Sequence, residues 1–392
     1  MGFRKIKAGK IFDGQRYLPG HVLVINDNGI IEDLIPFEDA GDVESYNGIL
    51  APGLVNCHCH LELSHMKGKI GEGTGLVDFV FRIMEGRNAP AEEILNAISL
   101  AEDEMLLNGI VAVGDICNNT NTIAQKKKNW IHYYNFIEVS GWLPSVAAKR
   151  IQIAKELSGI FKRELNDSGP LLSVVPHAPY SVSDNLWQQL QPFFKSNTVT
   201  IHNQEAFCEN DFFINATGDL TRMYRLLNME ISHHRSGYRS SLENYYERLN
   251  EASNIILVHN CFTSQADIEL VRSVSEKKLV KAQTFFCLCP NANLYIEKTL
   301  PPVDLFRENK CEIVLGTDSL ASNHSLDIMS EIRTIKKNFE SVPLEEMLKW
   351  ATWNGANALK MDRVLGSFEK GKRPGVVLID EENLTAQRML SV

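Results

Sequence analysis

The most constraining feature of this sequence is a series of apolar, strand-like runs separated by amphipathic helical patterns. The runs cover residues 49–58, 110–116, 130–139, 171–178, 199–205, 254–260, 284–290 and 312–318. Helical patterns lie beside them at residues 91–107, 183–194, 242–251, 265–274 and 326–338. Continuous apolar strands alternating with helices predict a parallel sheet buried on both faces. Eight such units over roughly 300 residues predict an α/β fold of the (β/α)₈ TIM-barrel type, which we place at residues 51–359.

The two ends of the chain read differently from the centre. Residues 1–50 contain short apolar runs punctuated by Asp13-Gly14 and Asn28-Gly29, which are hairpin signals. Residues 360–392 again hold a turn followed by an apolar strand. We therefore expect 1–50 and 360–392 to fold together as a small, β-sandwich-like domain beside the barrel. A doubly wound open sheet is the alternative for the centre, but no Gly-x-Gly-x-x-Gly follows an early strand.

Composition excludes several partner classes. The 392 residues are 44% hydrophobic and 23% charged, with a net charge of −9 and no basic run beyond Lys126-Lys-Lys128, expected to be a solvated helix end. We expect neither nucleic acid nor a membrane as partner, but a small-molecule substrate. The chain start lacks the apolar core of a signal peptide, and the eight cysteines lie mostly in apolar runs. Reduced thiols and a cytoplasmic location are therefore expected.

Polar residues gather where the apolar runs end. In TIM barrels the catalytic groups project from the carboxyl ends of the strands. Five of the eight runs end in, or just before, titratable side chains, which are His58, His60, His177, His202, Glu205, His259 and Asp318. Histidines scattered through a core would not collect at one end of a sheet. This edge is the predicted active site.

Residue type indicates the chemistry of that edge. Three histidines and one carboxylate make a nitrogen-rich metal site, completed by a water, which favours Zn²⁺ and has Fe²⁺ as the alternative. These ligands are His58, His60, His202 and Asp318. Glu205, three residues beyond His202, is the expected general acid/base. His259 is expected to hydrogen-bond the nucleophile, with an outer ligand role as the alternative. No lysine ends the third or fourth run to bridge two metals, so one metal is expected.

Several motifs give the chain a resemblance to a known family. It resembles the amidohydrolase superfamily, in its mononuclear aminohydrolase (deaminase) branch. The motifs are Pro52-Gly-Leu-Val-Asn-Cys-His-Cys-His60, Gly109-Ile-Val-Ala-Val-Gly-Asp115, His177-Ala-Pro-Tyr-Ser181, His202-Asn-Gln-Glu205 and Gly316-Thr-Asp-Ser-Leu-Ala-Ser-Asn323. The resemblance implies the same metal ligands, with Glu205 and His259 beside the nucleophile and Asp318 accepting the proton of the water. The implied reaction is hydrolytic deamination of an aromatic ring.

The choice of ring is less constrained. His60-Leu-Glu-Leu-Ser64, residues 75–87 and Cys289-Pro-Asn-Ala-Asn293 resemble the 6-aminodeoxyfutalosine deaminases of menaquinone biosynthesis. That resemblance implies sugar contacts from His177 and Glu85 and a benzoate contact from Arg82 or Arg87. Glu85 and both arginines also fit a solvated helix face. Glu62 and Ser64 could instead touch the edge of the base.

Other functions stay open at this point. The same scaffold fits S-adenosylhomocysteine, adenosine, guanine or cytosine deamination, or hydrolysis of a chlorinated triazine. A catalytically inactive binding protein would require a missing ligand, and none is missing. Barrels of this kind often pair through exposed helices, so a homodimer is one option, and the sequence does not decide the oligomeric state. Cys57 and Cys59 alternate with the metal histidines and are expected to pack against the helices.

Overall fold

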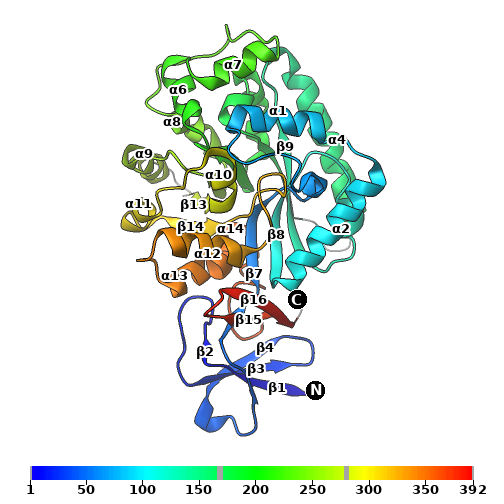
Figure 1. Ribbon diagram of the computed structural model, residues 1–392, viewed down its shortest axis with the longest axis vertical. Coiled ribbons are helices and arrows are strands. Elements are labelled where there is room, and N and C mark those ends of the chain that lie inside the picture. The colour runs from blue at the N-terminus through cyan, green and yellow to red at the C-terminus, as the bar shows by residue number, and fades with distance from the viewer. Residues whose placement is uncertain (1, 166–170, 278–281, 391–392) are drawn as a thin grey trace.

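The body of the molecule is built from two parallel sheets (Figure 1). The computed structural model describes residues 2–165, 171–277 and 282–390. One sheet has the order β10-β9-β8-β7 and the other β11-β12-β13-β14. The strands are β7 (Leu54–Cys59), β8 (Ile110–Cys117), β9 (His132–Val139), β10 (Leu171–Pro176), β11 (Thr198–Asn203), β12 (Asn254–His259), β13 (Gln283–Leu288) and β14 (Glu312–Leu315). The predicted α/β class with parallel strands is confirmed.

The two sheets meet at both edges. At one edge, the backbone N–H of Asp318, just beyond β14, donates to the carbonyl of His58 in β7 at 3.1 Å. At the other, the backbone N–H of His202 in β11 donates to the carbonyl of His177, just beyond β10, at 3.0 Å. These contacts bring the carboxyl ends of strands from both sheets to one place, as a closed barrel requires.

Helices separate these strands along the chain, and several of them pack against the sheets. They are α1 (Leu76–Gly86), α2 (Ala91–Leu107), α3 (Ile123–Lys126), α4 (Ala147–Glu164), α5 (Asp184–Leu190), α6 (Phe207–Asn215), α7 (Asp219–Leu226), α8 (Ser241–Tyr245), α9 (Gln265–Glu276), α10 (Pro290–Glu297), α11 (Val303–Glu308), α12 (Ile328–Asn338), α13 (Leu344–Lys349) and α14 (Gly355–Ala358). Local signals set their starts: Ser264 and Asp267 form a capping box at α9. Within the described part of the chain, no helix combines the length and apolarity needed to cross a bilayer.

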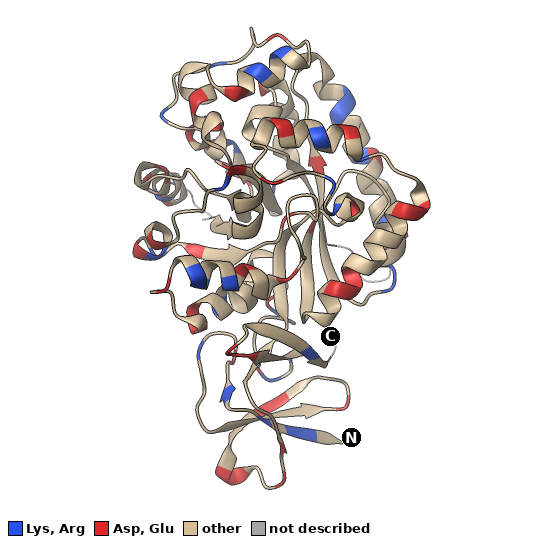
Figure 2. Cartoon of the chain, in the orientation of Figure 1, with Lys and Arg blue, Asp and Glu red and all other residues tan. Residues whose placement is uncertain are grey.

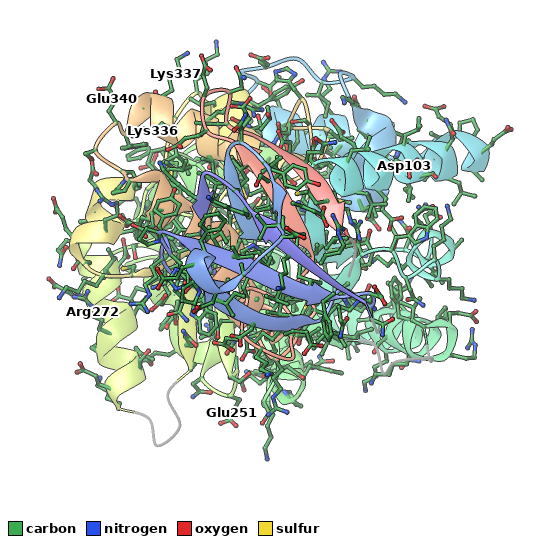
Figure 3. All side chains as sticks on the ribbon, turned by 90° about the horizontal axis from the view of Figure 1, so that it is seen from below. Asp103, Glu251, Arg272, Lys336, Lys337 and Glu340 are labelled. Carbon is green, nitrogen blue, oxygen red and sulfur yellow. The ribbon has the colours of Figure 1, made fainter. Side chains whose placement is uncertain are left out.

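Strands from both chain ends lie below this body (Figures 1 and 3). One sheet has the order β4-β3-β1-β5 and the other β16-β15-β6-β2. Their strands are β1 (Phe3–Lys7), β2 (Lys10–Ile11), β3 (His21–Asn26), β4 (Ile31–Pro36), β5 (Glu44–Ser45), β6 (Ile49–Pro52), β15 (Val376–Asp380) and β16 (Thr385–Leu390). Because β15 pairs antiparallel with β6, the chain ends share a sheet. Residues 391 and 392 of the expected terminal segment lie outside the described residues.

The run expected as one strand over residues 49–58 is divided at Gly53. Its first part is β6 in the terminal sheet, and its second part is β7 in the central sheet. A Cβ at Gly53 would lie 2.2 Å from Cγ1 of Val111 and 2.8 Å from the carbonyl oxygen of Pro374. Only glycine fits this crossing, so an apolar run that reads as continuous serves two sheets.

The basic run at Lys126 corrects another expectation. Lys127 and Lys128 are exposed, but the side chain of Lys126 is only 1% exposed and its Nζ lies 2.5 Å from Oδ2 of Asp115. Asp115 also accepts the backbone N–H of Leu61 at 2.9 Å, directly after His60. The buried ion pair therefore braces the segment that carries a predicted ligand. Elsewhere acidic and basic residues are interspersed along the chain (Figure 2).

Candidate active site

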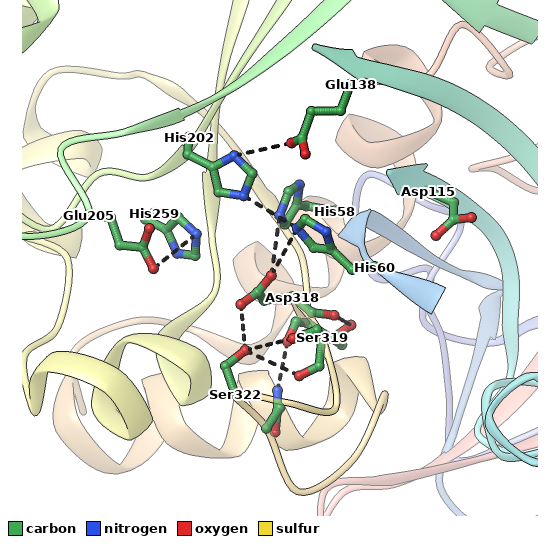
Figure 4. A network of polar contacts seen from close by, with 12 residues as sticks. His58, His60, Asp115, Glu138, His202, Glu205, His259, Asp318, Ser319 and Ser322 are labelled. Atoms are coloured by element: carbon green, nitrogen blue, oxygen red, sulfur yellow. Dashed lines mark hydrogen bonds and ion pairs between the residues drawn. The ribbon is translucent and has the colours of Figure 1, made fainter. Parts of the chain in front are cut away.

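The four predicted metal ligands come together at the carboxyl ends of the strands (Figure 4). Each offers one ligand atom, and these atoms all lie within 4.8 Å of one another. Nε2 of His58 and Nε2 of His60 lie 3.4 and 3.3 Å from Oδ1 of Asp318. Nε2 of His60 lies 3.3 Å from Nε2 of His202. His58 in β7 and His60 just beyond its end lie on one side because residues i and i+2 of an extended chain share a face. His202 in β11 and Asp318 after β14 supply the other two ligands.

The ring atoms show whether these residues fit a metal. Both ring nitrogens of His58 are buried, and no residue in the described part of the chain gives either a hydrogen bond. An unsatisfied buried polar group costs about 1–3 kcal/mol, so such a ring calls for a ligand. Nδ1 of His202 lies 2.8 Å from the carbonyl oxygen of His177 and donates to it, which leaves its Nε2 lone pair facing the cluster. The donor set fits one divalent metal.

Burial prepares the protonation states of the ligands. It lowers the pKa of His202 to about 4, with neighbouring His177 and His58 adding to the effect. It also lowers the pKa of His60 well below the usual range. Burial opposes ionisation of Asp318, but the surrounding imidazoles, led by His58, hold its pKa well below its usual range. Neutral imidazoles and an ionised carboxylate are the forms that bind zinc.

Glu205 lies beside this cluster, beyond β11. Its backbone N–H donates to Oε1 of Glu209 at 2.7 Å, which fixes the start of α6. Burial, and then the carboxylates of Asp318, Glu209 and Glu297, raise the pKa of Glu205 well above its usual range. These surroundings favour the protonated form of the side chain, which is the form that a general acid uses.

His259 ends β12 and faces Glu205. Its Nε2 lies 3.6 Å from Oε1 of Glu205, and Nδ2 of Asn293 donates to its Nδ1 at 3.0 Å. Since Nδ1 accepts that bond, the neutral ring carries its proton on Nε2, on the side of the cluster.

Backbone strain collects at the same place. Four non-glycine residues around the cluster have positive φ: Gln204 (46°), His259 (75°), Asn260 (61°) and Asp318 (57°). L-residues rarely adopt this conformation, and such outliers concentrate at functional sites.

A cavity of about 350 Å³ opens in front of the cluster. One wall is the apolar face of α1, and the aromatic rings of Trp142 and Tyr180 lie beside it. Further polar side chains line the cavity, among them Glu62, Arg87, Asn118, Glu138 and Arg150.

The lining of the cavity shows which of the predicted substrate-binding residues lie at the site. His177 and Arg87 line it, as does Glu62. Arg82 and Glu85 do not: their side chains are 65% and 67% exposed and pair with each other at 3.2 Å. They read as a solvated i,i+3 pair on the outer face of α1, so the structure does not place them at the site.

Sequence reasoning missed three of the lining residues. Glu138 is the last residue but one of β9, so a search for polar residues at strand ends could have found it. Asn118 directly follows β8 and carries the same signal. Arg150 belongs to α4, and its helical spacing does not distinguish it from a surface arginine.

The amidohydrolase family pattern matches residues 49–390, which is most of the chain. The chain belongs to the amidohydrolase family. Membership confirms the resemblance drawn from the motifs and the expected hydrolase class. Family members have a TIM-barrel fold, which agrees with the two parallel sheets of this amidohydrolase.

Curated relatives of this amidohydrolase include two deaminases. An adenosine deaminase of Helicobacter pylori is 25% identical over 335 residues, which cover 83% of this chain and 78% of the relative. A 5′-deoxyadenosine deaminase of Methanosphaera stadtmanae is 23% identical over 388 residues, covering 94% and 83%.

Two solved structures show the same fold. The H. pylori aminofutalosine deaminase, in complex with methylthio-coformycin, aligns with a TM-score of 0.79 at 22% identity and covers 96% of this chain and 92% of its own. An adenosine deaminase of Xanthomonas campestris with bound zinc aligns with a TM-score of 0.71 at 22% identity, covering 96% and 84%.

Proposed function

We propose that this amidohydrolase hydrolytically deaminates the adenine ring of a nucleoside and uses one divalent metal, with zinc as the first candidate. The observation that carries the proposal is the buried carboxyl group of Glu205, whose pKa is raised, beside a cluster of three histidines and one aspartate. The adenine-nucleoside deaminases among the relatives, and the zinc in the X. campestris structure, support it.

The metal supplies one part of the chemistry. When held by the four ligands described above, a divalent metal acts as a Lewis acid and lowers the pKa of a water to about 7, which provides a nucleophile at neutral pH.

Side chains around the cluster move the protons. Asp318, held ionised by its imidazole neighbours, accepts the proton of the attacking water. The Nε2–H of His259 orients the oxygen of that water toward the ring. Glu205 gives its proton to the ring nitrogen next to the attacked carbon. The proton taken by Asp318 then passes to the departing amino group, which leaves as ammonia. The proton that remains on the new hydroxyl group returns to Glu205, which leaves an oxo group on the ring and restores the acid.

The cavity accommodates the rest of the substrate. The apolar face of α1 and Trp142 give a surface for a flat ring, and His177 lies beyond the cluster for the sugar. Arg87 and Arg150 add two guanidinium groups, which suit a carboxylate at the far end of the substrate. Because 6-aminodeoxyfutalosine carries a benzoate, it is our first candidate substrate. The fold that this chain shares with the H. pylori aminofutalosine deaminase supports this choice.

Neutral adenine nucleosides are the second candidate class, favoured by the names of the curated relatives. Selective ammonia release from 6-aminodeoxyfutalosine would support the first class. Equal release from adenosine, 5′-deoxyadenosine and 5′-methylthioadenosine would replace it with the second. Silence across these nucleosides, and across guanine and cytosine, would contradict the proposed function.

The role of Glu205 has its own test. Glu205→Gln keeps size and hydrogen bonding but cannot transfer the proton, so kcat should fall by about 10²- to 10⁴-fold while the protein keeps its metal. Glu85→Gln, on the outer face of α1, is the matched control and should leave kcat unchanged. Steady-state ammonia release and metal analysis measure both. A Glu205→Gln enzyme with full turnover would remove Glu205 from the reaction.

We assign the chemistry to a catalytic barrel at residues 51–359 and a supporting role to a composite β domain of residues 1–50 and 360–392. Pairing of β15 with β6 supports this division. A cytoplasmic location and a homodimer stay predictions.

A further inference from the structure

One polar corner of the cavity is not used by the proton transfers. It consists of two carboxylates, Glu62 and Glu138, joined by Asn118. The backbone N–H of Asn118 donates to Oε2 of Glu62 at 2.9 Å. Its side-chain Nδ2 donates to Oε2 of Glu138 at 3.1 Å. One oxygen of each carboxylate is therefore fixed by protein.

Only the second oxygen of Glu138 is left without a hydrogen-bond donor or a guanidinium partner among the described residues. Oε1 of Glu138 is buried, on a side chain that is 7% exposed, and no described residue donates a hydrogen bond to it. It lies 3.7 Å from Nδ1 of His202, whose proton already goes to the carbonyl of His177 at 2.8 Å. Oε1 of Glu62, on a side chain that is 1% exposed, has the guanidinium of Arg87 at 3.6 Å. Buried acceptors of this kind are completed by a bound donor.

The neighbours decide what kind of donor fits. Glu138, His177 and His202 lie close enough to suggest a second metal site. Nδ1 of His202 is a donor to a carbonyl and cannot also be a ligand, which removes one of the three. Arg87 already supplies a positive charge beside Glu62, so this carboxylate does not require a cationic ligand. Neutral hydroxyl groups fit both conditions.

We propose that Glu138 and Glu62 bind hydroxyl groups of the substrate's sugar and give the enzyme its preference for ribonucleosides. Oε1 of Glu138, next to the predicted metal ligand His202, accepts a hydrogen bond from one hydroxyl group. Glu62 accepts a hydrogen bond from the neighbouring hydroxyl group. The proposal rests on the proposed nucleoside deaminase function. It assigns to Glu138 and Glu62 the sugar contact that the sequence suggested for Glu85.

The test compares sugars on matched variants. Values of kcat/KM are measured for adenosine, 2′-deoxyadenosine, 3′-deoxyadenosine and 2′,3′-dideoxyadenosine on wild type, Glu138→Gln, Glu62→Gln and Glu85→Gln. Gln can keep the bond to Asn118 through its amide oxygen, which protects the fold. Inhibition constants of inosine and 2′,3′-dideoxyinosine are measured with the nucleoside that is deaminated fastest as substrate. They give a second, independent measure of the preference for sugar hydroxyl groups.

Wild type should prefer adenosine over the analogue that lacks the bound hydroxyl by about 10- to 100-fold, the range expected for a hydrogen bond to a charged group. In Glu138→Gln that preference should shrink to within about threefold, with metal content unchanged. Glu62→Gln should act in the same way at the other hydroxyl, and Glu85→Gln should match wild type.

Two results would overturn the proposal. One is a wild-type enzyme that deaminates all four nucleosides equally. The other is a Glu138→Gln enzyme that loses the same factor on every sugar, which would make Glu138 a support for Asn118 and His202 only. No ammonia from 6-aminodeoxyfutalosine or from any of the four adenosines, with metal bound, would instead refute the proposed function itself.

Discussion

At the scale of single residues, the hydrogen bond at one ring nitrogen of an imidazole decides whether the other nitrogen offers a lone pair or a proton. The carbonyl of His177 takes the Nδ1 proton of His202 and leaves Nε2 as a ligand. Asn293 does the reverse at His259, where it donates to Nδ1 and leaves a proton on Nε2. Two rings 5.5 Å apart thus differ in tautomer, one suited to a metal and one to a water.

This difference predicts the effect of removing Asn293. Asn293→Leu should lower kcat by about 10- to 100-fold with little change in KM, because the His259 ring loses its fixed tautomer but the cavity keeps its shape. Asn291→Leu removes a part-buried amide from the same helix and is the control. Steady-state kinetics at saturating substrate would decide, and equal kcat values for both variants would contradict the assignment.

At the scale of elements, α12 holds the loop that carries Asp318. Glu331 on α12 accepts Nδ2 of Asn323 at 2.8 Å, and the same amide nitrogen donates to the carbonyl of Thr317 at 2.9 Å. Glu331 also accepts the backbone N–H of Asn291 at 2.9 Å. Burial raises its pKa to about 8, against the hydrogen bonds that favour its ionised form.

Glu331 should therefore make stability depend on pH. Its pKa in the folded state lies above the unfolded value of about 4.3, so the folded state binds more protons than the unfolded state between these two pH values. The free energy of unfolding should therefore fall as the pH rises from about 4.5 to 8. The slope is at most about 1.4 kcal/mol per pH unit. Glu331→Gln should flatten this slope. Urea unfolding at pH 5.5 and 7.5 measures it, with exposed Glu340→Gln as control. An unchanged slope in Glu331→Gln would show that other groups cause it.

The seam between β13, β14 and β7 has no room for a side chain at Gly316. A Cβ there would lie 2.9 Å from both Sγ of Cys287 and Cβ of His58. We expect Gly316→Ala to cost about 1–3 kcal/mol and to weaken metal binding, because His58 must move. Gly159→Ala in α4 meets nothing within 4 Å and should stabilise by about 0.5–1 kcal/mol. Thermal unfolding and metal titration check both, and metal binding equal to wild type in Gly316→Ala would refute the coupling.

At the scale of the whole molecule, the metal site joins the two central sheets. Its ligands come from β7, β11 and the segment after β14, so ligands from both sheets would share one ion. Binding to the folded state alone stabilises it by mass action.

Removing the metal should therefore lower Tm. At a metal concentration 100-fold above Kd, the loss corresponds to about 2.7 kcal/mol, and zinc should restore it. Differential scanning calorimetry with and without chelator measures the effect. His58→Ala should no longer respond to chelator, whereas His324→Ala, whose side chain is 79% exposed, should respond like wild type. A chelator that leaves the wild-type Tm unchanged would contradict the prediction that the bound metal stabilises the folded protein.

The sequence by itself determined the α/β class of the fold and predicted which residues form the candidate site. Continuous apolar runs with helices between them can only be buried as parallel strands, and the residues ending those runs share one edge because parallel strands end on one side. The metal ligands, Glu205 and His259 followed from that rule.

Tertiary structure decided what periodicity does not encode. Arg82, Arg87 and Glu85 share one segment, yet only Arg87 turns into the cavity. Lys126 looked solvated but pairs with Asp115, eleven residues away along the chain. Glu138 gained its importance from Asn118 and His202, which other strands deliver. Local spacing fixes the face on which a residue lies, whereas its partners depend on which strands meet, and that is settled only when the sheets pack.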